Sequence, residues 1–229
     1  MSLRMIHLAI ALVVAASSFS YAAELQTKSS MQPLSIKSVH DNPDMYLIQT
    51  FSIGYLGSKA HATVDIYADK SLAKRDTKPV TEDPQPKKEI PGITKPLDLT
   101  PAKCTSKVCF PGSYEPPLKT DCDALVEAQV YYSIGSLRIK PGWTVLVHAG
   151  TCVVVFQHPV GKAENNLTFE YNWASLGQII IDIQKKCDKP EALSIGGACK
   201  IDSYLKYNFE NVLISVQRYI APTTPAAGS

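Results

Sequence analysis

The stretch GWTVLVHAGTCVVVFQHP, from Gly142 to Pro159, decides the fold. Residues 143–147 and 152–156 are rich in β-branched side chains, and each run has the length of a strand. The residues between the two runs begin with His148 and contain a glycine, which suits a tight turn. The stretch therefore predicts a β-hairpin, with His148 in the turn and His158 at the end of the second strand.

A helical segment is expected on each side of this hairpin. The upstream helix begins at Thr120 or Asp121, since either side chain can act as the N-cap. The downstream helix runs from Trp173 to about Lys186 after a cap at Asn172, and its apolar residues follow the 3.6-residue period. Asn211 to Tyr219 is expected to be a last strand. This order predicts a small α+β two-layer sandwich, disulfide-stapled, in which two helices cover one face of an antiparallel sheet.

Three roles are open to Cys152, which lies in the second strand of the hairpin. A nucleophile needs a nearby base and a lowered thiol pKa, whereas burial in an apolar strand raises that pKa. The sequence around it also lacks the motifs of known cysteine proteases. No metal site is predicted, because Cys104 and Cys109 have a compact spacing but no second CxxC or HxxxH pair follows. A disulfide is the remaining role.

Residues 1–22 have the features of a secretory signal peptide. Arg4 precedes a short apolar run, and Ser20 and Ala22 occupy the small-residue positions of a cleavage site after Ala22. The apolar run is shorter than the roughly 20 residues that a membrane span needs. We therefore expect a secreted, extracellular chain with no stable membrane insertion.

The number of cysteines agrees with export. All of them lie beyond the signal peptide, and an even number in an exported chain predicts a disulfide framework. The sequence does not choose among the possible pairings. The six cysteines are Cys104, Cys109, Cys122, Cys152, Cys187 and Cys199.

Charge and motifs exclude several classes of function. The chain has 23 basic and 21 acidic residues, a formal net charge of +2, whereas nucleic-acid binding needs a strong basic excess. It lacks the G-x-S-x-G, H-E-x-x-H and phosphate-loop motifs, and Glu164, Glu170 and Asp182 lie on separate segments. We therefore expect no nucleic-acid partner, no cofactor and no enzyme activity, with an enzyme kept as the least favoured alternative.

Several aromatic residues stand at the starts or ends of predicted elements. Such rings either belong to the core or form a platform on which sugars stack, and the sequence leaves both readings open. The six residues are Tyr131, Tyr132, Trp143, Phe169, Tyr171 and Trp173.

Composition divides the chain into five segments. Two alternating stretches before residue 70 predict a β-hairpin, which either adds to the sheet of the later region or belongs to a prosegment with a temporary role. Prolines then recur among charged residues, which predicts an extended linker. The segments are a signal peptide (1–22), an N-terminal hairpin region or prosegment (23–75), a Pro-rich linker (76–103), a Cys-rich α+β domain (104–220) and a disordered tail (221–229).

Two short motifs indicate processing or modification. Lys74-Arg75, at the start of the linker, is either a dibasic cleavage site or an ordinary solvated charge pair. Asn166 begins an Asn-Leu-Thr sequon, which predicts N-glycosylation in an exported chain.

A series of short segments follows an order that is typical of one family. The segments are Asp121-Cys122-Asp123-Ala124-Leu125, Gly142-Trp143, Ala149-Gly150-Thr151-Cys152-Val153, a helix with Ile180 and Asp182, Gly196-Gly197-Ala198-Cys199, and Val212 to Val216. Over about residues 104–220 they resemble the Hce2 domain of Ecp2-type secreted fungal effectors, which are known as necrosis-inducing factors.

This resemblance implies a small disulfide-stapled domain without catalysis, similar to the viral killer toxins of fungi. Cys122, Cys152 and Cys199 match the family's cysteines, Trp143 is implied as core, and Cys187 is a plausible disulfide partner.

The expected function is that of a secreted fungal effector or toxin-like protein, with necrosis of host tissue as one expected outcome. It would act by binding an unknown host protein or glycan, or a component of a competitor, and an effector would reach the host apoplast. The alternative is a secreted carbohydrate-binding or cell-wall-associated protein.

Overall fold

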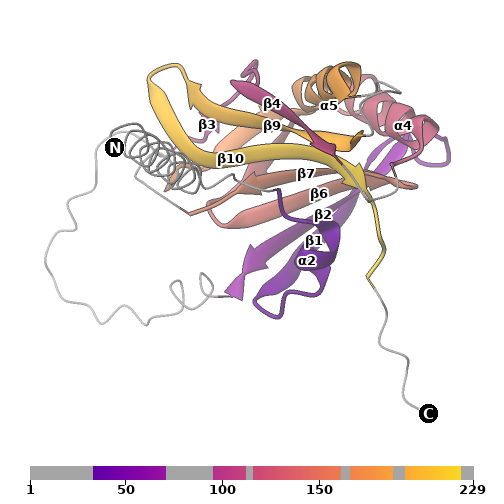
Figure 1. Ribbon diagram of the computed structural model, residues 1–229, viewed down its shortest axis with the longest axis horizontal. Coiled ribbons are helices and arrows are strands. Elements are labelled where there is room, and N and C mark those ends of the chain that lie inside the picture. The colour runs from indigo at the N-terminus through magenta and orange to yellow at the C-terminus, as the bar shows by residue number, and fades with distance from the viewer. Residues whose placement is uncertain (1–32, 71–94, 112–115, 161–165, 188–193, 223–229) are drawn as a thin grey trace, which may run out of the picture. The chain divides into compact units, whose positions relative to one another are not determined.

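The hairpin predicted between Gly142 and Pro159 forms the middle of a seven-stranded antiparallel sheet in the computed structural model (Figure 1). The structure describes residues 33–70, 95–111, 116–160, 166–187 and 194–222. The signal peptide with Ala22, the Lys74-Arg75 pair, residues 76–94 of the linker and residues 223–229 of the tail lie outside the described residues.

The seven strands are joined by antiparallel pairing throughout. Their order across the sheet is β1-β2-β6-β7-β10-β9-β4. In that order they span Met45–Gly54, His61–Asp69, Trp143–Ala149, Cys152–His158, Tyr207–Arg218, Ser194–Tyr204 and Ser106–Pro111.

A second, three-stranded sheet and three helices complete the described part. The small sheet has the order β3-β8-β5 and consists of Leu97–Asp98, Phe169–Asn172 and Ser136–Ile139. The helices are α2 (Ile36–His40), α4 (Lys119–Val130) and α5 (Trp173–Cys187). None of the described helices combines the length and apolarity that crossing a membrane requires. The α+β class predicted from the sequence is therefore confirmed.

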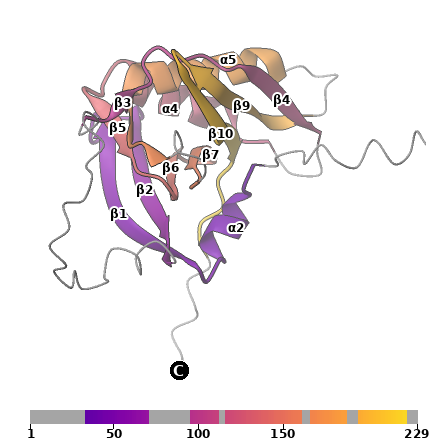
Figure 2. The ribbon, with the colours of Figure 1, turned by 90° about the vertical axis from the view of Figure 1, so that its left-hand side faces the viewer.

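Both faces of the central hairpin are buried, which explains why its strands are apolar at nearly every position. Val145, Val147 and Phe156 belong to the main core together with α4 and α5. Leu146 and Val153 belong to a second cluster that includes α2. Figures 1 and 2 show α4 and α5 on one side of the sheet and α2 on the other. We call the latter the α2 face.

The turn of the hairpin is shorter than the sequence predicted. β6 continues through Ala149, which pairs with Cys152, so only Gly150 and Thr151 form the turn. Gly150 has a φ of 53°, as two-residue hairpin turns require. The prediction that His148 lies in the turn is therefore wrong, because His148 is a strand residue. His158 ends β7, as predicted.

The N-terminal hairpin is part of the sheet. β2 pairs with β6 from Thr63 opposite His148 to Ala68 opposite Trp143. The N-terminal hairpin therefore extends the sheet of the Cys-rich region, which was the first of the two alternatives predicted from the sequence.

The predicted start of the second helix is confirmed, whereas the predicted start of the first helix is wrong. α5 begins after Asn172, whose Oδ1 accepts a hydrogen bond from the backbone N–H of Ala174 at 2.8 Å, as predicted. α4 begins at Lys119 with Leu118 as the N-cap residue, so the prediction of Thr120 or Asp121 is wrong. The Asp121 carboxylate bonds to the β6–β7 turn and is therefore not used as a cap.

The end of the Pro-rich segment is ordered and partly buried. Leu97 and Asp98 pair in parallel with β8, and Leu99 has no exposed surface. The carbonyl of Ala102 accepts a hydrogen bond from the buried Tyr171 hydroxyl at 2.8 Å. Residues 95–103 therefore belong to the fold, and the prediction of an extended linker is wrong for them, because their leucines find partners in the small sheet.

All six cysteines form disulfides, as predicted, and the structure supplies the pairing. Cys104–Cys199 joins the segment before β4 to β9, Cys109–Cys187 joins β4 to the end of α5, and Cys122–Cys152 joins α4 to β7. All three lie downstream of β1 and β2. The N-terminal hairpin is therefore held to the sheet by hydrogen bonds and packing.

Candidate functional site

Cys152 is bonded to Cys122 and completely buried. It belongs to the main core, whereas His148 lies on the α2 face beside Asp65. His158 stands at the other end of β7. The structure therefore does not bring either histidine and the cysteine together as a nucleophile and its base.

His158 is a structural histidine. Only 1% of its surface is exposed, its Nε2 donates to the carbonyl of Leu167 at 2.7 Å, and its ring stacks on Phe169 with centroids 3.9 Å apart. Burial lowers the pKa of His158 to about 4, although the bond to Leu167 opposes this shift. The ring is therefore neutral at physiological pH and ties β7 to β8.

A cluster of titratable side chains lies on the α2 face. The Nε2 of His148 is 3.1 Å from Oδ2 of Asp65, and the hydroxyl of Thr50 donates to Oδ1 of Asp65 at 2.7 Å. Burial alone would raise the pKa of Asp65, but the bonds from His148 and Thr50 outweigh it and hold the pKa below its usual value. Asp65 is therefore a carboxylate at neutral pH.

Aromatic rings cover this pair. Tyr219 stacks on His148 with centroids 3.9 Å apart, and His40 of α2 lies 6.0 Å from Tyr219 and 5.8 Å from Tyr67. Burial lowers the pKa of His40. We call His40, Thr50, Asp65, Tyr67, His148 and Tyr219 the polar cluster. It joins α2, β1, β2, β6 and the segment that follows β10.

The polar cluster contains a histidine and a carboxylate but not the order that nucleophilic catalysis needs. In a hydrolase triad the hydroxyl donates to the histidine. Here the hydroxyl of Thr50 donates to Asp65, and Tyr219 covers the His148 ring. The geometry fits a buried polar network that holds chain segments together. In the described part of the chain, no group of three or more acidic, histidine or cysteine side chains is placed to hold a metal ion.

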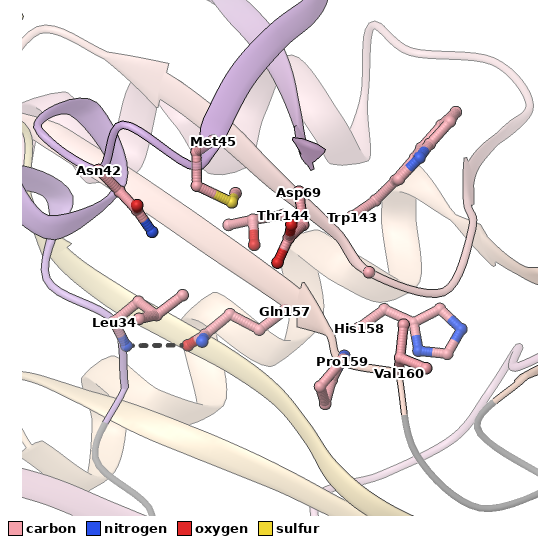
Figure 3. Close-up of a pocket in the computed structure, with 11 residues that line it drawn as sticks. Leu34, Asn42, Met45, Asp69, Trp143, Thr144, Gln157, His158, Pro159 and Val160 are labelled. Carbon is pink, nitrogen blue, oxygen red and sulfur yellow. Dashed lines mark hydrogen bonds between the residues drawn. The ribbon is translucent and has the colours of Figure 1, made fainter. Parts of the chain in front are cut away.

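A pocket of about 390 Å³ opens where β2 and β7 end and β6 begins, at the opposite end of β6 from His148 (Figure 3). Leu34 closes one side, where its backbone N–H donates to Oε1 of Gln157 at 3.1 Å. The polar side chains that face the pocket are Asp69, Thr144 and Gln157, and the Trp143 and His158 rings are directed away from the side that Leu34 closes (Figure 3).

Exposed apolar side chains lie on the β1–β2 turn and at and just beyond the end of α4. The rings of Tyr55 and Tyr132 lie 6.3 Å apart, which places the two segments side by side. We call this group the hairpin-tip surface. Its members, with their exposed fractions, are Tyr55 (65%), Leu56 (72%), Tyr131 (75%), Tyr132 (50%) and Ile134 (100%).

The backbone beneath the hairpin-tip surface is closely packed. A Cβ atom at Gly54 would lie 2.9 Å from the Cβ of Ala128, so the end of β1 rests directly on α4. The N–H of Tyr55 donates to the carbonyl of Ala60 at 2.9 Å, and the Ser133 hydroxyl donates to the carbonyl of Ala128 at 2.7 Å. The backbone that carries these exposed side chains is therefore held in place by packing and hydrogen bonds.

The aromatic platform predicted from the sequence is not formed by its six members. Phe169, Tyr171 and Trp173 are buried in the main core, because they lie on β8 and at the start of α5. Trp143 is half-buried, with the Lys140 ammonium 5.3 Å from its ring centre. Only Tyr131 and Tyr132 reach the hairpin-tip surface, and the sequence reasoning missed its other three members. Ile134, an apolar residue within the short Ser-Ile-Gly-Ser segment after α4, was the available signal in the sequence.

The predicted glycosylation residue, Asn166, is exposed, and the neighbouring Leu167 is anchored through its carbonyl to His158. The side chain of Asn166 is therefore accessible to a glycan.

Comparison with family models, with curated proteins and with solved structures finds no match to this chain. The resemblance to the Hce2 domain accordingly stays a prediction.

Proposed function

We propose that this protein is a secreted, non-catalytic binding protein of the fungal effector or toxin-like kind, which recognises a protein of a host or a competitor through the hairpin-tip surface. The observation that carries the proposal is the cluster of five exposed apolar side chains, in which Ile134 is fully exposed. Contiguous exposed apolar side chains on a folded chain mark interaction sites.

The composition of the surface favours a protein partner. Tyrosines supply large contact areas at low entropic cost and are enriched among the residues that dominate protein interfaces. Leu56 and Ile134 add aliphatic side chains that gain free energy when they enter an apolar pocket. Sugars offer fewer such pockets, since they bind aromatic faces mainly by stacking.

The scaffold supports an extracellular role. Three disulfides stabilise a chain that works outside the cell, including the apoplast of a host. The two-layer sandwich of sheet and helices, with the Hce2-like order of its elements, is part of the same proposal. The packing of α4 and α5 against the main core supports it.

Carbohydrate binding is the second candidate. Tyr55 and Tyr132 present two neighbouring exposed rings, and such a pair can stack on successive sugars. Sedimentation with chitin and β-glucan tests this candidate. If a Tyr55→Ser/Tyr132→Ser variant and the wild type sediment to the same small extent, carbohydrate binding by this surface is excluded.

The proposed function is tested by infiltrating the purified exported protein into leaves of a range of plants. We expect necrosis with the wild type and at least a tenfold higher threshold dose with a Leu56→Ser/Ile134→Ser variant. Leu205→Ser is the matched control, because Leu205 is 78% exposed in the β9–β10 turn and lies outside the hairpin-tip surface. No response to the wild type in any plant would rule out a host partner, and equal responses to both variants would contradict recognition through the hairpin-tip surface.

A further inference from the structure

The seven-stranded sheet has two edges that differ in how they are protected. β4 forms one edge and β1 the other. Edge strands present unpaired N–H and C=O groups, and proteins commonly guard them with short strands, lysines, prolines or covering segments.

The β4 edge has several of these protections. Ser106–Pro111 is a short strand that contains Lys107 and a proline. The ammonium of Lys107 pairs with Asp182 of α5 at 3.3 Å, and the Lys186 side chain donates to the carbonyl of Lys107. Cys109 is bonded to Cys187. A further strand is therefore poorly accommodated at this edge.

The β1 edge has almost none of these protections. Met45–Gly54 is a ten-residue strand with the sequence MYLIQTFSIG, which contains no charged residue and no proline. Its first half exposes Tyr46, Leu47 and Ile48, with exposed fractions of 36%, 50% and 39%. The one irregularity is a bulge between Leu47 and Gln49. Among the described residues, no strand pairs with the outer side of β1.

Hydrogen bonds at the two ends of the hairpin show which backbone groups of β1 point outward. Lys70 donates to the Asp44 carbonyl at 2.7 Å, and Tyr55 donates to the Ala60 carbonyl at 2.9 Å. In an antiparallel pair, residues that bond to the neighbouring strand alternate with residues that do not. We follow this alternation along the pairing register, starting from the bonded pair at each end of the hairpin. It places the backbone N–H and C=O groups of Leu47, Thr50 and Ser52 on the side of β1 that faces away from β2.

We propose that the outer edge of β1 pairs antiparallel with β1 of a second copy of this chain, so that the two sheets become continuous. The strand is neutral, so it meets its own copy without like-charge repulsion. The formal net charge of the whole chain is only +2, which keeps long-range repulsion between copies small. Antiparallel pairing of identical strands also satisfies the two-fold symmetry of most dimers.

The bulge restricts the register of this pairing. The regular part of β1 is Gln49–Gly54, and a two-fold axis at Phe51 places Thr50 of each copy opposite Ser52 of the other. The outward-pointing groups of both residues then bond across the interface. A strand of another protein could form the same backbone hydrogen bonds. The β1 edge, however, has no charged side chain that would favour one particular foreign strand over others.

Ser52 provides the test, because a proline there removes an outward N–H and leaves the bonds to β2 intact. Sedimentation equilibrium of the exported protein, from about 1 to about 200 μM, would measure the mass. We expect a dimer for the wild type and for the matched control Ser52→Ala, and a monomer for Ser52→Pro that still unfolds cooperatively, at a lower temperature because the dimer no longer stabilises the fold. A monomeric wild type at every concentration overturns the proposal, whether or not it binds foreign strands.

Ser52→Lys is the second variant, for the case in which the proline disturbs folding. Two lysines placed diagonally across the axis, about 7–8 Å apart, repel each other without altering the backbone. We expect this variant to be monomeric in low salt. A folded Ser52→Lys protein that dimerises as strongly as Ser52→Ala would contradict the proposed interface.

Discussion

The carboxylate of Asp121 accepts hydrogen bonds from both the backbone N–H and the hydroxyl of Thr151, at 2.7 and 2.6 Å. This contact joins the first turn of α4 to the turn of the central hairpin, beside the Cys122–Cys152 disulfide. The start of α4, the helix whose other end carries Tyr131 and Tyr132, is thus tied to the sheet by one covalent link and one pair of charged hydrogen bonds.

Replacement of Asp121 by asparagine should weaken this link. The bonds from the Thr151 side chain and backbone lower the pKa of Asp121, so they stabilise the fold while the carboxylate is charged. We expect a loss of about 1 kcal/mol in the free energy of unfolding. Urea denaturation at pH 7 measures it. Because the folded pKa is depressed, the difference between wild type and variant should shrink as the pH falls below the usual value of 3.8. A difference that grows in acid would contradict this account.

Replacement of Gly150 by alanine should also destabilise the protein. A Cβ atom there would lie 2.6 Å from the Asp121 carboxylate, and the φ of 53° is unfavourable for alanine. We expect a loss of about 1–2 kcal/mol, measured by thermal or urea unfolding. Gly57→Ala is the control, since Gly57 also has a positive φ but an added Cβ would contact nothing within 4 Å. Equal losses in the two variants would show that crowding against Asp121 is unimportant.

Burial of His158 predicts a loss of stability in mild acid. Its pKa is about 4 in the folded protein against an ordinary value of 6.5, so between these values the unfolded chain binds the extra proton. Stability is therefore full above pH 6.5 and falls as the pH drops toward 4, by about 3 kcal/mol in total.

His158→Phe should flatten this dependence, because phenylalanine keeps the stacking on Phe169 but does not titrate. Urea unfolding of both proteins between pH 4 and pH 7 makes the comparison. If the free energy of unfolding falls equally steeply with decreasing pH in both proteins, His158 is not the group that causes the loss of stability in acid.

The three disulfides should contribute unequally. In the chain-entropy model a crosslink stabilises more when it closes a longer loop. Cys104–Cys199 spans 95 positions and Cys122–Cys152 spans 30. We expect losses of about 5 and about 4 kcal/mol for the corresponding double replacements by serine. Guanidinium unfolding gives the ranking, and a reversed order would indicate that strain or residual structure outweighs loop length.

The central hairpin and α5 were predictable because their signals are local. Burial on both faces requires the apolar runs of β6 and β7, and Asn172 marks the start of α5. β9 was missed because Gly196 and Gly197 resemble a turn in the sequence. In the structure a Cβ on Gly196 would collide with the Val216 carbonyl, so close packing requires glycine within this strand.

The hairpin-tip surface was only half predictable. Tyr131 and Tyr132 are adjacent in the sequence and were identified as candidates. Tyr55 reaches Tyr132 only because β1 and β2 join the sheet and β1 ends on α4. No local pattern encodes such a contact, since it depends on the pairing of β2 with β6.

Export with three closed disulfides is the claim on which the proposed function rests. The most direct test is the intact mass of the protein collected from the culture medium, before and after reduction. The account predicts a chain without residues 1–22 that gains two hydrogens for each of the three disulfides on reduction. A chain that retains the signal segment, or one whose mass does not change on reduction because all six thiols are free, would contradict it.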